Sequence, residues 1–189
     1  QSQRGASELI IYMPDRDYLF AHIAHTLDTL STNIMEAQIF SCTDDHMTLV
    51  MMYFLNRDTH DYLDESRHDE VINKIKFQLT QTDVKPLEIR NNIRNRRTRH
   101  FDTPTVVDFK QTNDALTELS ISTKDSPGLL ARIGCALKNN NIRLHDAKIR
   151  TEGEKAEDIF LISDTNNEAI KSKEKLNNIS KAIKDLIEN

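Results

Sequence analysis

Residues 118–133 read ELSISTKDSPGLLARI, and residues 8–23 read ELIIYMPDRDYLFAHI. These stretches open two segments, 8–53 and 118–163, that align with each other without a gap. Ten residues recur unchanged 110 positions later: Glu8, Leu9, Ile11, Asp15, Leu19, Ala21, Ile23, Leu27, Ala37 and Ile39. The apolar spacing between them also agrees, which is the signature of an internal repeat. The chain is therefore a duplication, with a first and a second repeat.

Each repeat predicts the same order of elements. A run of β-forming residues ends at an Asp-containing turn, and an apolar stripe at helical spacing follows it. A strand hairpin and a second amphipathic helix complete the unit. The predicted ranges are 9–13, 19–30, 33–43, 47–55 and 65–79 in the first repeat, and 116–123, 129–137, 142–151, 157–163 and 174–187 in the second. The order is βαββα twice.

This order, with one closing strand per repeat, predicts an α+β protein of two ferredoxin-like βαββαβ domains. Each would have an antiparallel sheet with both helices on one face. We expect the first domain at 1–89, a basic connector at 90–103 and the second domain at 104–189. The segment 105–109 is the predicted closing strand of the second domain. Residues 84–89 are the candidate in the first, although Pro86 is tolerated mainly at sheet edges.

The composition predicts a soluble, folded protein. Hydrophobic residues make up 38% and charged residues 29%, and the net charge of −5 disfavours a nucleic-acid partner. No stretch reaches the roughly 18 apolar residues of a membrane span, and the chain opens without a leader pattern. Cys42 and Cys135 lack the spacing of a disulfide framework or a zinc site. We expect a cytoplasmic protein that binds no membrane, and a fragment of a longer chain because Gln1 replaces an initiator Met.

The turn Asp125-Ser126-Pro127-Gly128-Leu129-Leu130-Ala131-Arg132-Ile133 resembles the strand-to-helix turn of ACT domains, which are small-molecule sensor modules. Three further segments extend the resemblance. They are Pro14-Asp15-Arg16-Asp17-Tyr18-Leu19-Phe20, Arg99-His100-Phe101, and Leu144-His145-Asp146-Ala147-Lys148-Ile149 followed by residues 154–160. Together they are similar to the C-terminal tandem ACT domains of the bacterial PII uridylyltransferase/uridylyl-removing enzyme family, from residue 8 to residue 164.

The resemblance implies a regulatory rather than a catalytic fragment. In that family the tandem ACT domains sense glutamine and control uridylylation and deuridylylation of the PII nitrogen-regulatory protein. The catalytic domains lie upstream of the region matched here, so the expected partners are glutamine, those domains and, through the whole enzyme, PII. The resemblance implies no cofactor in this fragment. The dipeptides His60-Asp61, His68-Asp69 and His145-Asp146 lack the dispersed ligands of a metal-dependent phosphohydrolase, and we predict no catalytic residue.

A turn of this kind can hold an amino acid. The N-terminus of a helix offers unpaired N–H groups to a carboxylate, and Gly128 lets a ligand approach the backbone. Asp125 could pair with the ammonium group or could simply cap the helix; spacing alone favours capping, and the family resemblance favours the ligand. The predicted ligand-binding residues are Asp15, Arg16, Asp17, Tyr18, Asn33, Asp125, Ser126, Pro127, Gly128, Leu129, Leu130 and Arg143.

The two predicted sites differ in sequence. The first repeat has Asp17-Tyr18 where the second has Pro127-Gly128, which puts close approach of a ligand in doubt there. Asn33, where ACT sensors often direct a side-chain amide to the ligand, corresponds to Arg143 in the second repeat. We expect either tighter binding in the second repeat or a purely structural role for one copy.

Several alternatives remain open. Five arginines, Arg90, Arg94, Arg96, Arg97 and Arg99, form a basic cluster that fits a solvated linker or a docking strip better than a nucleic-acid site, because no aromatic residues alternate with them. His22 and His25 lack a third ligand at defined spacing, so we predict no metal site. The rival to a sensor is a protein-docking module without a small ligand. A homodimer through exposed sheet edges is also left open.

Overall fold

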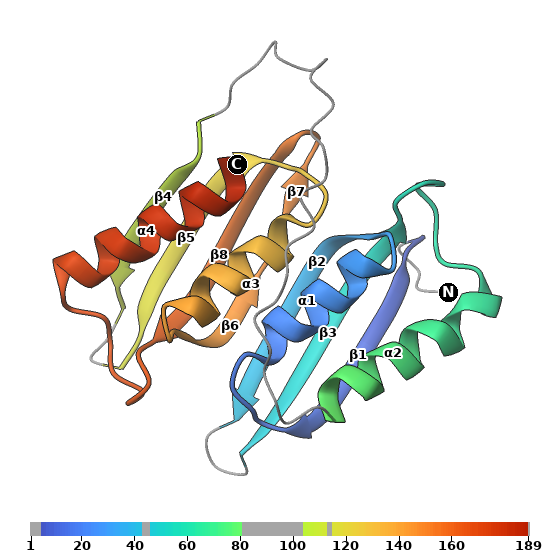
Figure 1. Ribbon diagram of the computed structural model, residues 1–189, viewed down its shortest axis with the longest axis horizontal. Coiled ribbons are helices and arrows are strands. Elements are labelled where there is room, and N and C mark those ends of the chain that lie inside the picture. The colour runs from blue at the N-terminus through green and yellow to red at the C-terminus, as the bar shows by residue number, and fades with distance from the viewer. Residues whose placement is uncertain (1–4, 43–45, 81–103, 113–114, 189) are drawn as a thin grey trace.

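The computed structural model describes residues 5–42, 46–80, 104–112 and 115–188 (Figure 1). The first repeat contains β1 (Ser7–Pro14), α1 (Leu19–Thr29), β2 (Thr32–Cys42), β3 (Met47–Asn56), the single 3-10 turn η1 (Glu65–Arg67) and α2 (His68–Thr80). The second contains β4 (Val106–Gln111), β5 (Thr117–Lys124), α3 (Leu129–Asn139), β6 (Arg143–Lys148), β7 (Thr151–Glu152), β8 (Lys155–Ser163) and α4 (Lys173–Glu188). The predicted βαββα order is confirmed in both repeats.

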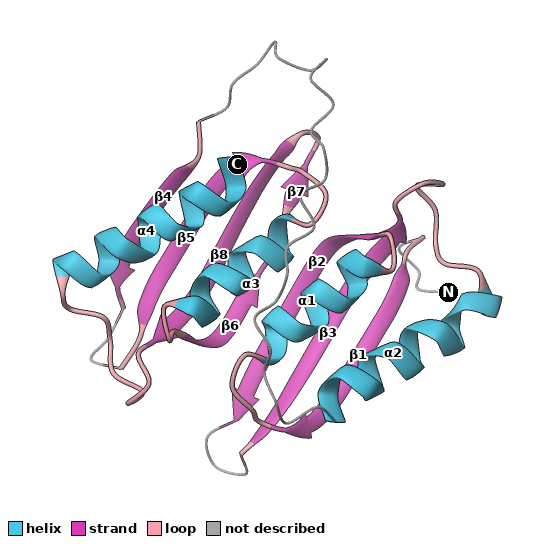
Figure 2. Cartoon of the chain, in the orientation of Figure 1, coloured by secondary structure: helices cyan, strands magenta, loops and turns pink. Residues whose placement is uncertain are grey.

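The strands form one antiparallel eight-stranded sheet in the order β1-β3-β2-β6-β8-β5-β4, with β7 paired to β8. All four α-helices cover one face of this sheet (Figures 1 and 2). The α+β class and the ferredoxin-like arrangement are confirmed. What the sequence did not predict is that the sheets of the two repeats join at their edges into one.

The closing strand of the second repeat lies where the sequence predicts it. β4 pairs antiparallel with β5 from Val106 opposite Ser122 to Gln111 opposite Thr117, and it occupies the end of the sheet. The corresponding candidate of the first repeat, residues 84–89, and the connector at 90–103 lie outside the described residues. The expected domain boundaries therefore stay a prediction.

The two repeats join through β2 and β6, and the register of this join shows its symmetry. Gln38 pairs with Lys148, its own equivalent 110 positions later. Ile39 then pairs with Ala147, the equivalent of Ala37. Equivalent residues thus lie on opposite sides of an axis through the Gln38–Lys148 pair. The repeats are related by a pseudo-two-fold axis, as two copies are in an isologous dimer.

The helices reinforce this join on the covered face of the sheet. α1 and α3 lie side by side so closely that a Cβ atom on Gly134 would lie 2.8 Å from the Ala21 Cα atom. Phe20 of α1 meets Phe160 of β8 edge to face, with ring centroids 6.1 Å apart. Both phenylalanines belong to one buried cluster that includes residues of both repeats. The repeats therefore share a single apolar core.

Two predicted elements differ in detail from the structure. The predicted strand 142–151 divides into β6 and β7, because Ile149 turns into the core at 3% exposure and the Arg150 carbonyl accepts the Glu157 N–H at 2.8 Å. The predicted helix 65–79 begins with one 3-10 turn, in which the Arg67 N–H donates to the Asp64 carbonyl at 2.9 Å. Neither difference alters the topology.

Candidate ligand-binding site

A shallow pocket, open to solvent, lies at the junction of the two repeats. The turn between β5 and α3 forms one wall, and the end of α1 with the start of β2 forms another. Strand β8 contributes from below the turn. The polar side chains along it include Asp28, Thr32, Asn33, Asp125, Ser126 and Asp158. This mixture of polar and apolar walls suits a small polar ligand.

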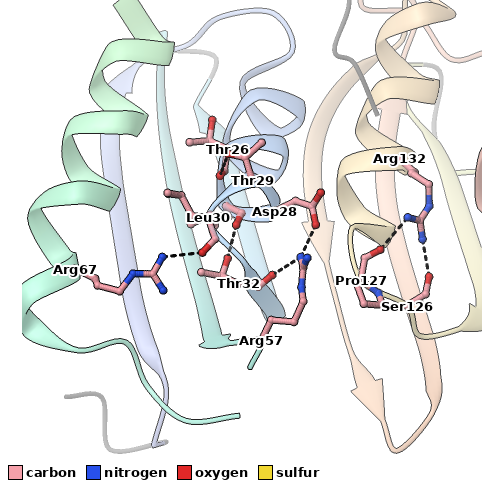
Figure 3. A network of polar contacts seen from close by, with 11 residues as sticks. Thr26, Asp28, Thr29, Leu30, Thr32, Arg57, Arg67, Ser126, Pro127 and Arg132 are labelled. Atoms are coloured by element: carbon pink, nitrogen blue, oxygen red, sulfur yellow. Dashed lines mark hydrogen bonds and ion pairs between the residues drawn. The ribbon is translucent and has the colours of Figure 1, made fainter. Parts of the chain in front are cut away.

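The second-repeat turn is shaped by Gly128 at the N-terminus of α3. Gly128 has φ +73°, and a Cβ atom there would lie 3.0 Å from the Asp28 Oδ1 atom across the pocket. Glycine alone keeps this conformation free of strain and the approach open. Arg132, one turn into the helix, donates to the Ser126 hydroxyl at 2.6 Å and to the Pro127 carbonyl at 2.8 Å (Figure 3). The turn is therefore held from its outer side while its inner side faces the pocket.

The helix N-terminus itself differs from the prediction at one residue. The Leu129 N–H donates to the Ser126 carbonyl at 3.0 Å, within the turn. The Arg132 N–H is the first to bond back into the helix, to the Gly128 carbonyl at 3.0 Å. The N–H groups of Leu130 and Ala131 have no intrahelical acceptor, as at any helix start. These two N–H groups, rather than that of Leu129, can receive an anionic group.

Asp125 is anchored within the second repeat and lines the pocket opposite Asn33 of the first. Its backbone N–H donates to the Glu154 carbonyl at 2.8 Å. Burial raises the pKa of its carboxyl group, and hydrogen bonds from the Ser126 backbone and the Asn33 side chain lower it in part, as does the charge of Arg132. Asn33 lies at the start of β2 in the first repeat, so the two residues line the pocket from opposite sides of the pseudo-two-fold axis. The sequence predicted both residues, but only the fold assigns them to one site.

Asp158 of β8 is a pocket residue that the sequence analysis missed, as are Asp28 and Thr32. It is 1% exposed, and neither of its carboxyl oxygens has a hydrogen-bond partner of normal geometry. Burial raises its pKa to about 7; the nearby Arg150 N–H lowers it somewhat, and the charge of Asp125 raises it further. The alternation of buried Ala156, Phe160 and Ile162 places Asp158 on the inward face of the strand. That pattern was a readable signal, because a carboxylate rarely occupies such a position.

The opposite wall of the pocket is held by arginines of the first repeat. Arg57 forms an ion pair with Asp28 and donates to the Thr32 carbonyl at 2.9 Å (Figure 3). Arg67 donates to the Leu30 carbonyl at 2.9 Å. These contacts fix the end of α1 against the start of β2. Asn33 is consequently presented to the pocket by an ordered segment.

At the symmetry-related place in the first repeat, the protein's own side chains contact one another. Tyr18 occupies the Gly128 position with φ +63°, and its hydroxyl lies 3.4 Å from the Asn141 Oδ1 atom. The Lys138 Nζ atom lies 5.9 Å from the Tyr18 ring centroid. Arg143, the equivalent of Asn33, pairs with Asp17 at 3.1 Å. The structure thus brings Asp17, Tyr18 and Arg143 together, as it does the second turn and Asn33.

Asp15 and Arg16 also have partners within the first repeat. The Thr48 hydroxyl donates to the Asp15 Oδ1 atom at 2.6 Å, and Arg16 donates to the Leu79 carbonyl. The predicted ligand-binding residues therefore divide between one open pocket and one place where the protein's own side chains are paired.

The remaining sequence signals lie apart from the pocket. The dipeptides His60-Asp61, His68-Asp69 and His145-Asp146 lie in a loop, at the start of α2 and in β6. Across the described ranges, no cluster of three or more His, Cys, Asp or Glu side chains could hold a metal ion. The arginine cluster at 90–99 lies outside these ranges. No helix in the described part is long and apolar enough to cross a bilayer.

Comparison with known proteins agrees with this architecture. Residues 117–175 match the family model of the ACT domain. The chain is 49% identical over 189 residues to a bifunctional uridylyltransferase/uridylyl-removing enzyme of Hydrogenovibrio crunogenus, covering 99% of this chain and 21% of that protein. The enzyme of the same name from Vibrio parahaemolyticus is 36% identical over 165 residues, covering 86% and 18%. The chain spans about a fifth of the length of these curated relatives.

Among solved structures, the aspartate kinase of Synechocystis matches 97% of this chain with 28% of its own. The TM-score is 0.52 and the sequence identity is 18%. Identity this low establishes a common fold and nothing about the ligand.

Proposed function

We propose that this chain, which contains an ACT domain and is homologous to one segment of the bifunctional uridylyltransferase/uridylyl-removing enzymes, is the amino-acid sensor of such an enzyme. Its proposed ligand is glutamine. Its role is regulatory: ligand binding here alters the uridylylation and deuridylylation of the PII protein by catalytic domains elsewhere in the same polypeptide. The chain acts as a cytoplasmic protein in this role.

The observation that carries the proposal is the composition of the pocket at the junction. An α-amino acid presents a carboxylate and an ammonium group a short distance apart. The N–H groups of Leu130 and Ala131 at the start of α3 provide donors and a partial positive charge for the carboxylate. Asp125 provides a carboxyl group for the ammonium. The Asn33 amide, which lines the same pocket as Asp125, provides both a donor and an acceptor for the ligand.

We propose one ligand for each chain. Tyr18 and the Asp17–Arg143 ion pair occupy the place that is open beside Gly128 and Asn33 in the second repeat. Binding there would require breaking these contacts, whereas the pocket of the second repeat needs no such rearrangement. The first turn then has a structural role in joining the repeats.

The position of the pocket suggests how binding becomes a signal. Its walls come from both repeats, so a bound ligand stabilises the arrangement in which β2 and β6 are paired. A ligand shifts an equilibrium only when it binds one arrangement better than another. A pocket at the junction meets that condition. Separation or rotation of the repeats would divide Asn33 from Asp125.

Glutamine titration of the chain tests this function. Thermal unfolding at a glutamine concentration 100 times the dissociation constant should show stabilisation of roughly 2.7 kcal/mol for a single site. Calorimetry should give one site for each chain. Glutamate at the same concentration is the matched control for side-chain recognition. Unchanged melting and no heat of binding with glutamine would refute the sensor function.

A second candidate function is docking of a protein partner on the open face of the sheet. Ile10, Tyr12 and Phe40 are 59%, 64% and 48% exposed, on the side of β1 and β2 opposite to the buried Ile39 and to the core-packing Ile11. Apolar side chains gathered on an uncovered sheet can mark an interaction surface. A docking module without a ligand would leave the glutamine titration flat. A sensor that also docks would respond to glutamine.

A further inference from the structure

Thr48 and Asp158 occupy equivalent positions in the two repeats, but they differ in the hydrogen bonds that they can make to the neighbouring turn. Thr48 is 1% exposed and its hydroxyl satisfies the Asp15 carboxylate at 2.6 Å. Asp158 lies 110 positions later and lines the pocket together with Asp125, the equivalent of Asp15. A threonine can donate a hydrogen bond to a carboxylate, but an ionised aspartate cannot. The second repeat therefore has two facing acceptors where the first has a matched donor and acceptor.

Among the described residues, Asp158 accepts no hydrogen bond of normal geometry. It is as buried as Thr48, yet neither carboxyl oxygen makes a hydrogen bond of normal geometry. The Arg150 N–H is near enough to lower its pKa, but that effect is smaller than the effect of burial. A buried ionised carboxylate without a partner is costly. It must either carry a proton or receive a donor from a bound molecule.

The charged groups around the pocket are already engaged. Asp28 on α1 pairs with Arg57, and Arg132 on α3 donates to the second-repeat turn. The charge of Arg132 lowers the pKa of Asp125, and the charge of Asp125 raises the pKa of Asp158. The pocket thus brings two carboxyl groups together, and both would stabilise a cationic group placed between them.

We propose that Asp158 and Asp125 together hold the α-ammonium group of the ligand, and that binding releases the proton which the empty carboxyl pair shares. This inference rests on the function proposed above and adds a residue and a proton to it. An ammonium group has three N–H donors, enough to reach both carboxyl groups. The site thereby requires a primary ammonium group and rejects acyl-blocked or deaminated analogues.

The proton gives the proposal a measurable signature. The pKa of Asp158 is about 7, so near pH 7 the empty pocket carries about half a proton that an ammonium ligand must displace. Affinity for glutamine should rise as the pH increases through 7 and level off near pH 8. The expected gain between pH 6 and pH 8 is about tenfold.

Calorimetry of the whole chain with L-glutamine tests both signatures. Titrations at pH 6, 7 and 8 measure the affinity. Titrations at pH 7 in phosphate and in Tris, which differ in ionisation enthalpy, measure the proton released. We expect release of about half a proton for each ligand near pH 7. N-acetyl-L-glutamine, which lacks the ammonium group, should not compete.

Two variants separate ligand binding from a structural role. Asp158→Asn keeps the shape but removes the titrating group, so proton release should disappear and affinity should fall at pH 8. Asp158→Thr reproduces the Thr48 arrangement and supplies Asp125 with an internal donor, so glutamine affinity should fall at least tenfold. Both variants should remain folded, and the ligand-free Asp158→Asn protein should melt higher than the wild type at pH 8 because a buried charge is gone.

The outcomes distinguish this inference from the proposed function. Wild-type protein that binds glutamine with pH-independent affinity and no proton release, together with Asp158→Asn binding equally well, would overturn the inference alone. Tight binding of N-acetyl-L-glutamine would do the same. Wild-type protein that binds no glutamine at any pH would overturn the proposed function and this inference together.

Discussion

The two strand-to-helix turns have the same backbone conformation but carry different side chains. At the first helical N-cap, Tyr18 adopts φ +63°, and at the second, Gly128 adopts φ +73°. The tyrosine side chain contacts the second repeat, whereas the glycine leaves a pocket. The comparison shows how a duplicated fold becomes functionally asymmetric. The backbone is kept, and single side chains decide which copy can admit a ligand.

The residues that approach each turn from the other repeat also differ between the two turns. Lys138 and Arg143 approach the first turn, which carries Tyr18 and Asp17. Their equivalents Asp28 and Asn33 approach the second. At the first turn, Lys138 and Arg143 thus approach the Tyr18 ring and the Asp17 carboxylate. At the second turn, the Asn33 amide and the Asp28 carboxylate, which is paired with Arg57, line the pocket. Exchanges between equivalent positions are the sharpest way to test the difference.

The largest expected effect concerns the core that the repeats share. Phe160→Ala should lower the free energy of unfolding by about 3–5 kcal/mol, because it opens a cavity beneath Phe20 of the other repeat. The matched change Val50→Ala at the equivalent position removes less volume and should cost about 2 kcal/mol. Urea unfolding measures both. Equal costs would indicate that the repeats are not coupled through Phe160.

Exchange at the turn itself should remove ligand binding. Gly128→Tyr places the first-repeat side chain in the pocket mouth and should weaken glutamine binding by at least about 100-fold, or 2.7 kcal/mol. Because a Cβ atom there meets Asp28, thermal unfolding of the variant checks that it remains folded. Tyr18→Gly is the control and should bind as the wild type does. Calorimetry that finds Gly128→Tyr fully competent would place the ligand elsewhere.

The helices should also differ in their response to acid. His22 on α1 is 3% exposed, and burial followed by nearby positive charges lowers its pKa to about 4; its equivalent in the second repeat is Arg132, which does not titrate in this range. The unfolded chain binds this proton near pH 6.5, so stability is lost as the pH falls from 6.5 toward 4. His22→Gln should therefore gain about 1–2 kcal/mol relative to the wild type between pH 7 and pH 5.

Asp158 acts in the opposite direction over the same interval. Its pKa is raised in the folded state, so the folded chain takes up the proton first and gains stability as the pH falls through 7. The wild-type stability can therefore stay nearly flat although both groups titrate. Urea unfolding of His22→Gln and Asp158→Asn at pH 5 and 7 should show slopes of opposite sign. Parallel slopes in both variants would contradict the assignment.

The smallest effect is expected at the amide across the axis. Asn33→Ala should weaken glutamine binding about tenfold, the worth of one hydrogen bond to a charged or strongly polar group. Arg143→Ala changes the equivalent residue at the first turn and should leave the affinity unchanged while breaking the pair with Asp17. If calorimetry finds the same loss of glutamine affinity in both variants, the two places contribute equally to ligand binding.

Much of the fold was readable from local pattern. The repeat, the order of elements and the closing strand at β4 follow from apolar spacing and β-forming runs, because period and propensity act within a few residues. The glycine at the N-terminus of α3 was readable too, since only glycine adopts positive φ without cost. One local feature was not predicted: the predicted strand 142–151 breaks between β6 and β7, where the Ile149 side chain is buried in the core.

The sequence predicted only part of the site, because the residues of the site come together through long-range contacts. Asp125 and Asn33 were each predicted, but their meeting depends on the pairing of β2 with β6, which no local pattern encodes. Asp158 was missed because its role depends on the residues that surround it in the fold. An inward carboxylate is neutral or a binding group according to the donors that surround it, and those belong to other elements.

The sequence by itself determined the duplicated βαββα unit, the turn with its glycine, and the inward position of the strand residues, since these depend on backbone conformation and periodicity along the chain. The tertiary structure decided that the two sheets become one, that each turn is completed by the opposite repeat, and that the protein's own side chains pair at one of two equivalent places. Those outcomes depend on which side chains meet across the pseudo-two-fold axis. Burial, shape and charge at that meeting are properties of the folded chain alone.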